Sequence, residues 1–303
     1  MEVVFLNKQL RGSLILVLTA MIWGAAFTAQ SAGMDLVGPF TMQATRFLLA
    51  GLVNLPFALA MRKQNRMLRM AYGFSKKQMA FRAIICGLIL TAASTLQQYG
   101  LQFTTPGKSG FITALYIVLV PIAGIFIGKK TSFTLWIGVL CAAVGLYFLC
   151  IQGDFQIGMG DLLTLGSAVF FAAQILFIDY IGSSMSGVTL SCIQAFVCSA
   201  VSFVLMLIFE KPVLADIFAC WLPICYTGIL SGGLAYTLQI IGQQGTDPTL
   251  ASLVMSLESV FAVLFALLLL HQTPSSRELT GCAFMFCGII LSQLPPIKRN
   301  KKM

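Results

Sequence analysis

The sequence predicts an all-α membrane protein of ten transmembrane helices, arranged as two inverted five-helix repeats. Three observations carry this prediction: an apolar composition, ten long apolar segments, and a match between the two halves of the chain. Of the 303 residues, 58% are hydrophobic and only 10% are charged, whereas a soluble domain carries about 25% charged residues. One hydrophobic core cannot bury so much apolar surface, so lipid is the expected solvent.

Each predicted span is a run of roughly 20 mostly apolar residues, the length that crosses a bilayer as a helix. The first run follows Lys8 and Arg11 and resembles a signal peptide, but nine more runs follow it, so we interpret it as an uncleaved first helix. The only substantial loop is expected at 61–81. The ten spans are 13–32, 39–60, 82–103, 109–128, 133–151, 161–181, 187–209, 217–241, 249–270 and 278–294.

The basic residues orient these spans. With the N-terminus inside, 15 lysines and arginines fall in cytoplasmic segments, and only Lys108, Lys211 and Arg277 fall outside. Basic residues collect on the cytoplasmic side of membrane proteins. We therefore expect a multi-pass protein of a cytoplasmic (inner) membrane with both termini in the cytoplasm. The formal charge of +9 then faces membrane lipids, and we predict no nucleic acid partner.

The two halves of the chain, 1–153 and 154–303, are predicted to be repeats of one unit. The matched positions are Gly12 and Gly160, Thr105-Pro106 and Asp247-Pro248, Gly138 and Gly281, and Gly145 and Gly288, at offsets of 148, 142, 143 and 143 residues. Because five helices is an odd number, the second half must sit upside down relative to the first. Inverted repeats are typical of secondary transporters, whose halves move against each other around a site at their interface.

Polar residues recur at helical spacing in spans that the repeat relates. The third span carries Thr91, Thr95, Gln98 and Gln102, and the eighth carries Gly232, Tyr236, Gln239 and Gln243, offset by 141 at every position. The first span carries Thr19, Trp23, Ala26 and Gln30, and the sixth carries Ser167, Phe171, Gln174 and Ile178, offset by 148. Such spacings share one helix face. Amides lose hydrogen bonds in lipid, so the stripes should face inward, where they either line a polar cavity or join helices.

Arg46 and Glu258 are the only charged residues well inside predicted spans. A charge at bilayer depth costs roughly 3 kcal/mol or more, so each needs a partner, water or a change of protonation. Three interpretations of Glu258, whose repeat mate is Tyr116, remain open. It carries a coupling proton, it binds substrate, or it locks the ninth helix structurally, against Arg46 for example. Arg46 lies nearer the outer face, where it can reach lipid headgroups instead.

Two short motifs are typical of intramembrane enzymes. The run 107–110, Gly-Lys-Ser-Gly, matches a serine-protease pattern, but the only histidine, His271, is expected on another helix at the membrane edge. The run 158–161, Gly-Met-Gly-Asp, matches an aspartyl-protease pattern but lacks the Tyr-Asp motif that brings the second carboxylate. Gly-rich turns produce such patterns by chance, so we predict no enzyme activity. Without a Walker sequence or a C-x-x-C pair, we also predict no cofactor and no metal site.

The order of several short motifs resembles the drug/metabolite transporter superfamily, in its EamA-type branch. The resemblance covers essentially the whole chain. The motifs are Trp23-Gly24-Ala25-Ala26-Phe27, Arg46-Phe47-Leu48-Leu49-Ala50, Ser256-Leu257-Glu258-Ser259-Val260-Phe261-Ala262, and Gly288 in the last span. The chain departs from the family pattern at Gly128-Lys129 and His271-Gln272, where Gly-Glu is common, and at Ser259, where Pro is usual.

The resemblance implies a secondary transporter with a central cavity lined mainly by the first, third, fourth, sixth, eighth and ninth spans. Members of the family move amino acids, nucleobases, sugars and other metabolites, often outward. We therefore predict a permease or exporter of small metabolites such as amino acids, with alternating access between the repeats and protons as a candidate coupling ion. The alternative is a non-transporting polytopic membrane protein, such as an intramembrane hydrolase or an assembly partner.

The predicted site combines hydrogen-bonding amides, aromatic walls and one carboxylate. The predicted substrate-binding residues are Trp23, Gln98, Tyr116, Phe171, Gln174, Tyr236, Gln239 and Glu258, and Glu258 is also the predicted ion-coupling residue. Such a site suits a small zwitterion or cation better than a phosphate, which needs several basic groups.

Overall fold

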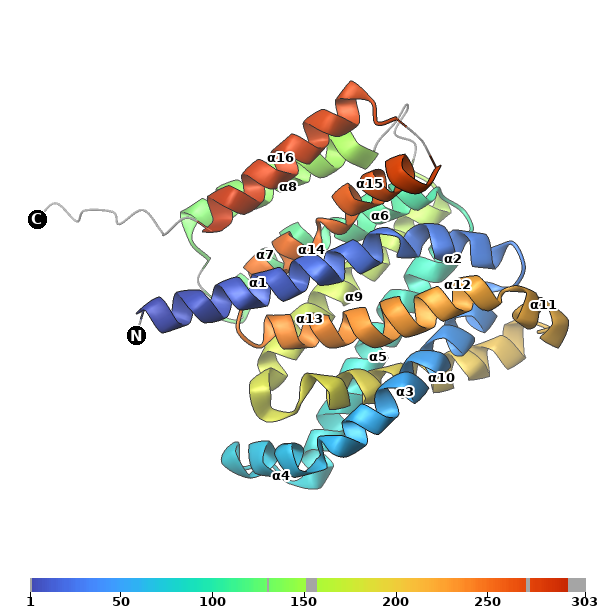
Figure 1. Cartoon of the computed structure of the whole chain (residues 1–303), viewed down its shortest axis with the longest axis horizontal. Helices are drawn as coiled ribbons and strands as arrows, with labels where there is room; N and C mark the ends of the chain where they lie inside the picture. The colour runs from blue at the N-terminus through green and yellow to red at the C-terminus, as the bar shows by residue number, and fades with distance from the viewer. Residues whose placement is uncertain (1, 130, 151–156, 271–272, 294–303) are drawn as a thin grey trace, which may run out of the picture.

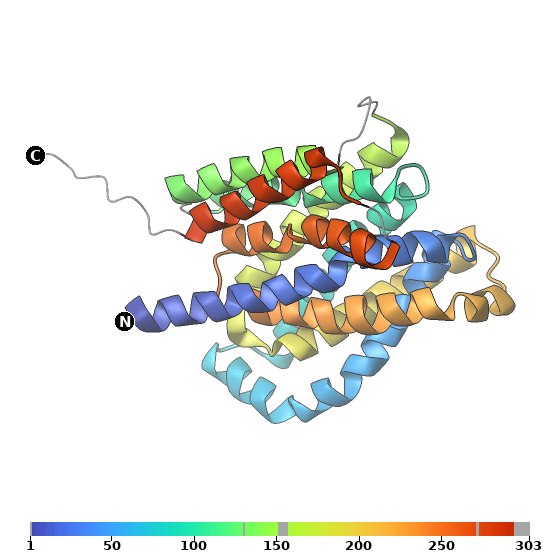
Figure 2. The ribbon, with the colours of Figure 1, turned by 45° about the horizontal axis from the view of Figure 1, so that its top comes forward.

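The protein is a bundle of helices packed side by side (Figure 1). The computed structural model describes residues 2–129, 131–150, 157–270 and 273–293. Every regular element in these ranges is helical. The start of α1 and the end of α16 lie at the same end of the bundle in both views (Figure 1, Figure 2).

The described residues of the first half form eight helices. They are α1 (Glu2–Gly24), α2 (Ala26–Met34), α3 (Pro39–Ala60), α4 (Arg62–Ala71), α5 (Lys76–Gly100), α6 (Pro106–Ala114), α7 (Tyr116–Phe126) and α8 (Phe133–Cys150). The second half forms α9 (Met159–Ile181), η1 (Gly182–Ser184), α10 (Gly187–Phe209), α11 (Leu214–Ala219), α12 (Trp221–Cys225), η2 (Tyr226–Ala235), α13 (Tyr236–Gln243), α14 (Pro248–Met255), α15 (Glu258–Leu270) and α16 (Ser276–Gln293).

Eight helical segments of the described chain are long and apolar enough to cross a membrane. Two of the ten predicted spans fall short of that mark. The predicted span 133–151 corresponds to a shorter apolar helix, Phe133–Leu149, and the span 278–294 corresponds to α16, whose polar ends lower its mean hydropathy. The all-helical membrane class is therefore observed, while ten crossings stay a prediction.

Local sequence signals set several helix starts. Thr105 caps α6 by accepting from the backbone N–H of Lys108, and Asp247 caps α14 by accepting from those of Thr249 and Leu250. In each case a proline occupies the first helical position, where a backbone N–H would have no partner within the helix, so its absence costs no hydrogen bond. These two repeat-related positions therefore both open helices.

The expected loop at 61–81 is wrong in its first part, because α4 occupies Arg62–Ala71 and α5 begins at Lys76. The segment is basic, which favours a solvated loop, but it also contains good helix formers and places Met67 and Met70 among its exposed apolar residues. Ser75 and Gln78 then form a reciprocal capping box that starts α5 six residues before the predicted span. α4 lies at the edge of the bundle opposite α8 and α16 (Figure 1).

α8 and α16 pack against each other through paired glycines. A Cβ on Gly145 would lie 2.7 Å from the carbonyl oxygen of Gly281, and one on Gly138 would lie 2.6 Å from that of Gly288. Glycine allows this close approach, as small residues do between membrane helices. The earlier glycine of α8 contacts the later glycine of α16, and the later one contacts the earlier one, so the two helices run antiparallel (Figure 2).

Several spans are interrupted part-way along their length. α1 ends at Gly24 before α2, α6 meets α7 at Leu115, and α14 and α15 are separated by Ser256 and Leu257. Between α12 and α13, η2 is a stretch of the wider π-helix. Breaks and π-turns free backbone polar groups, so they are tolerated at membrane depth only where protein or a water-filled cavity surrounds them.

Candidate functional site

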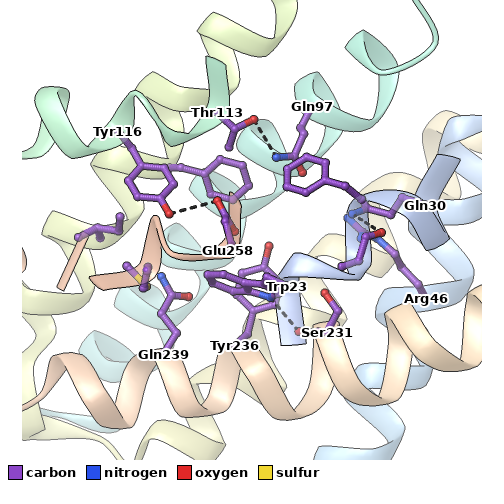
Figure 3. Close-up of a pocket in the computed structure, with 15 residues that line it drawn as sticks. Trp23, Gln30, Arg46, Gln97, Thr113, Tyr116, Ser231, Tyr236, Gln239 and Glu258 are labelled. Carbon is purple, nitrogen blue, oxygen red and sulfur yellow. Dashed lines mark hydrogen bonds between the residues drawn. The ribbon is translucent and has the colours of Figure 1, made fainter. Parts of the chain in front are cut away.

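A pocket lies where these interruptions meet (Figure 3). Its walls come from both halves of the chain. The lining residues are Trp23, Ala26, Phe27, Gln30, Arg46, Gln97, Thr113, Tyr116, Phe171, Ile175, Ser231, Tyr236, Gln239, Met255 and Glu258. The free volume is about 40 Å³, and a buried water needs roughly 10–15 Å³. The pocket therefore has room for a few waters, and a metabolite needs its walls to part.

Aromatic side chains form one wall. The rings of Trp23 and Tyr236 meet edge-to-face with centroids 5.1 Å apart, a favourable arrangement for two ring quadrupoles. Tyr236 also lies 6.0 Å from the ring of Phe47, outside the pocket lining. The indole Nε1 of Trp23 donates to the carbonyl oxygen of Ser231, 3.4 Å away in η2. This bond ties α1 to the irregular part of the eighth span.

Glu258 begins α15, just after the break in the ninth span, and is 5% exposed. Its Oε1 accepts a hydrogen bond from the Tyr116 hydroxyl at 3.2 Å. Tyr116 begins α7 after the break in the fourth span, so the two repeat mates bond directly to each other. The described residues place no basic side chain in a salt bridge with Glu258.

Arg46 lines the same pocket, so the expectation that it reaches lipid headgroups is wrong. It is 3% exposed, and Gly228 of η2 packs closely on α3 beside it: a Cβ on Gly228 would lie 2.9 Å from the carbonyl oxygen of Arg46. Its Nε donates to Oε1 of Gln43 at 2.6 Å, and its guanidinium lies 4.7 Å from the ring centre of Phe47. It forms no salt bridge with Glu258 in the described part of the chain.

A chain of amides leads from the pocket into the packed interior. Nε2 of Gln239 donates to Oε1 of Gln174 at 3.0 Å, and Nε2 of Gln174 donates to Oε1 of Gln194 at 3.4 Å. Nε2 of Gln194 in turn lies 3.1 Å from the Cys86 sulfur. The chain joins α13, α9, α10 and α5, so Gln239 lines the cavity while the amides behind it connect helices.

The structure brings six of the eight predicted substrate-binding residues together around the pocket: Trp23, Tyr116, Phe171, Tyr236, Gln239 and Glu258. Gln174 lies behind Gln239, as its hydrogen bond shows. Gln98 is fully buried and is not part of the lining, and its side-chain oxygen and nitrogen both lack a partner in the described chain.

Sequence reasoning missed Gln97, Thr113 and Ser231 as lining residues. Gln97 lies off the polar stripe that runs through Gln98, because neighbouring residues on a helix point about 100° apart. Nε2 of Gln97 donates to the hydroxyl of Thr113 at 3.0 Å. Ser231 joins the lining because of the π-helical stretch, which no hydrophobic period predicts.

The two enzyme-like motifs meet at a helix end. Asp161 accepts from Lys108 Nζ at 2.6 Å, from Thr104 Oγ1 at 2.8 Å and from the backbone N–H of Gly158 at 2.8 Å. This is a helix-capping arrangement, which explains the carboxylate without a second acid. Ser109 is fully buried and its hydroxyl has no partner in the described chain. His271, its only candidate base, lies outside the described residues.

Comparisons with known proteins agree with this picture. The model of the EamA-like transporter family matches the chain twice, over residues 10–151 and 158–294. An uncharacterized transporter of Archaeoglobus fulgidus is 30% identical over 290 residues, which cover 95% of this chain and 87% of the relative. An uncharacterized transporter of Clostridium kluyveri is 20% identical over 305 residues, covering 96% and 95%.

A solved crystal structure shares the fold. It superposes with a TM-score of 0.76 at 20% sequence identity and covers 93% of this chain and 96% of its own. At that identity the likeness establishes the fold alone. The family model, however, accounts for nearly the whole chain in two successive matches. The chain belongs to the EamA-like transporter family and is a membrane transporter.

Proposed function

We propose that the protein is a secondary transporter of small metabolites, such as amino acids or related compounds, that works by alternating access to the central pocket. The observation that carries the proposal is the pocket itself, whose polar and aromatic walls come from both halves and from interrupted spans. Substrate sites of many transporters lie at such interrupted helices between repeats. The side-chain oxygens of Gln30 and Gln239 have no partner in the described chain and lie beside this cavity, where a ligand can donate to them.

Ten spans in two inverted repeats, 1–153 and 154–303, are part of the proposal. The paired glycines of α8 and α16 support it, because they form a reciprocal set. Gly138 contacts Gly288 and Gly145 contacts Gly281, while Gly138 matches Gly281 and Gly145 matches Gly288 in the repeat. Equivalent positions that exchange partners across an antiparallel contact are what a pseudo-two-fold axis between inverted halves produces.

Contacts between the ends of different spans support the proposed orientation of the protein in the membrane. Lys129 pairs with Asp179, and both are expected at the cytoplasmic face. On the other face, Glu210 accepts from the backbone N–H groups of Phe40 and Thr41, each at 2.8 Å. Each pair joins segments that the ten-span arrangement puts on one side of the membrane, with both termini in the cytoplasm of an inner-membrane protein.

Two apolar clusters support alternating access, because they occupy repeat-related positions. The Met42 cluster consists of Val37, Met42, Cys220 and Ile224. The Met79 cluster consists of Met79, Ala83, Cys86, Ile178, Ile181, Met185, Leu190 and Ile240. Met185 and Leu190 lie 148 residues after Val37 and Met42, and Cys220 and Ile224 lie 141 residues after Met79 and Ala83.

The difference between the clusters matches the asymmetry of the pocket. The Met79 cluster extends inward through Ile178. The repeat mate of Ile178 is Gln30, which lines the pocket on the other side. We propose that the Met79 cluster closes the cytoplasmic side in this state. When it opens, Gln98 takes the place of its mate Gln239, which gives the buried, unpartnered amide of Gln98 a role in binding, with Gln174 beside it.

Glu258 is the proposed ion-coupling residue. Its carboxyl is enclosed, has one hydrogen-bond donor and lies at the contact between the two halves. A proton bound there changes the charge of the pocket in whichever state faces water, which links proton binding to the exchange between states.

Uptake by purified protein in proteoliposomes tests the proposal. A panel of labelled amino acids and other small metabolites, with and without a pH gradient, is expected to include compounds taken up above the level of empty vesicles. Met255→Trp adds an indole to the small pocket and is expected to block that uptake. Ile290→Trp puts the same ring on the exposed face of α16 and is the matched control.

Two results would contradict the proposal. One is that no compound of the panel enters under any condition. The other is that Met255→Trp, folded by circular dichroism, transports as well as Ile290→Trp, because the pocket would then not be on the substrate's path.

A further inference from the structure

Arg46 and Glu258 give the pocket one basic and one acidic side chain. Both side chains line it, both are almost completely buried, and no salt bridge joins them in the described chain. Figure 3 shows them reaching the pocket from different sides, Glu258 beside Tyr116 and Arg46 beside Gln30. Buried charges are normally paired or fully hydrogen-bonded, so this arrangement calls for a ligand.

The guanidinium of Arg46 is oriented but only partly used. Its Nε donates to Gln43, and its plane lies near the ring of Phe47. The described residues provide no hydrogen-bond partner for its two terminal nitrogens. An arginine with a purely structural role would direct them at carbonyl or carboxylate oxygens. Here a forked donor faces a cavity, and this fork matches the two oxygens of a carboxylate.

Glu258 has an unused hydrogen-bond acceptor, which complements the unused donors of Arg46. Oε1 accepts from Tyr116, and Oε2 has no partner among the described residues. A ligand with a carboxylate but no ammonium group would pair with Arg46 and leave Oε2 of Glu258 without a donor, while a ligand with an ammonium group but no carboxylate would leave the terminal nitrogens of Arg46 unused. A molecule with a carboxylate and an ammonium group pairs with both.

We propose that Arg46 is the residue that recognises the substrate's carboxylate, so that the pocket selects zwitterions held between Arg46 and Glu258. This inference rests on the proposed transport function and assigns its substrate class. The apolar surfaces of Phe27, Ile175 and Met255 then face the uncharged part of the molecule. Phosphate is a poorer match, because Arg46 is the one basic residue in the lining.

Charge-edited ligands test the assignment without a known substrate. The probes are an equimolar mixture of the common neutral amino acids, the mixture of their carboxamides, which lack the carboxylate, and the mixture of their N-acetyl derivatives, which lack the ammonium group. Apparent affinities come from the rise in the unfolding temperature of the purified full-length protein with ligand concentration. The wild-type protein is expected to bind the amino acids about 10- to 100-fold more tightly than the carboxamides.

Variants then assign each preference to one residue. In Arg46→Gln the amino acids and carboxamides are expected to bind equally, while Arg46→Lys, which keeps the charge but not the fork, retains part of the preference. In Glu258→Gln the preference over N-acetyl derivatives is lost instead. Arg82→Gln is the matched control, because it removes a guanidinium that packs on the rings of Phe74 and Tyr180 outside the pocket.

The outcomes separate this inference from the proposed function. Equal binding of amino acids and carboxamides by the wild-type protein overturns the inference, whether or not Arg46→Gln folds, and leaves metabolite transport standing. A preference that survives in Arg46→Gln overturns the role of Arg46. Failure of all three mixtures to bind overturns the zwitterion site, and if no compound of the uptake panel is transported either, the proposed function fails with it.

Discussion

Replacing Glu258 by Gln is expected to leave the chain folded and to reduce gradient-driven accumulation of substrate to the level of empty vesicles. The amide has the shape of the carboxyl and its oxygen still accepts from the Tyr116 hydroxyl, so packing at the start of α15 is preserved. It cannot take up or release a proton, so a pH gradient no longer biases the exchange between states. Uptake into proteoliposomes at several gradients measures the effect.

Tyr116→Phe is the control for this substitution. It removes the hydrogen bond that Glu258 accepts from the Tyr116 hydroxyl and adds no new polar group, but it keeps the ionisable carboxyl. Dependence on the gradient should therefore persist in Tyr116→Phe. Transport by Glu258→Gln with unchanged rate and pH dependence would rule out a proton relay through this residue and leave it a structural role.

Replacing Ile178 by Gln is expected to open the cytoplasmic side of the transporter. Ile178 is 1% exposed within the Met79 cluster, and its repeat mate Gln30 lines the open pocket. A buried, unpartnered amide costs about 1–3 kcal/mol, which corresponds to a shift of about 5- to 150-fold toward the state in which the amide meets water. The rate of alkylation of Cys86, a fully buried member of the same cluster, reports the shift.

The reciprocal substitution, Gln30→Ile, provides the matched test. It makes the open side apolar like the closed one, so it is expected to disfavour the state that is open on that side and to lower the solvent exposure of the pocket from that side. If the pocket of Gln30→Ile stays as exposed from that side as the pocket of the unmodified protein, the equivalence of the two sides is wrong.

The sequence was sufficient for the class of fold because membrane insertion leaves few alternatives: apolar runs must be helices, and inward-facing amides must be the exceptions. Six predicted site residues meet at the pocket for the same reason. The polar residues at helical spacing include Trp23 in the first span and Tyr236 in the eighth, so each of these side chains lies on the inward face of its own helix. The offsets of 148 and 141 residues also relate the Met42 and Met79 clusters, which no single span reveals.

The features of the site that the sequence does not predict arise from departures from regular helix geometry and from contacts between spans. The π-helical stretch that brings Ser231 to the pocket and the breaks before Tyr116 and Glu258 have no periodic signal. The position of Arg46 along its span favours the membrane edge. Its burial depends on packing between spans, such as the close approach of Gly228 to the Arg46 carbonyl oxygen, which the sequence of α3 alone does not contain.

The most direct test of alternating access is the labelling of Cys86 in the unmodified protein. Reconstituted protein is treated with a membrane-impermeant maleimide from one side at a time, and mass spectrometry locates the modified cysteine. The Met79 cluster is expected to open toward the cytoplasm, so Cys86 should label slowly at rest, faster with transported substrate, and only from the cytoplasmic side. If Cys86 stays unlabelled during transport, under conditions that label it in the unfolded chain, the Met79 cluster does not open and the account is contradicted.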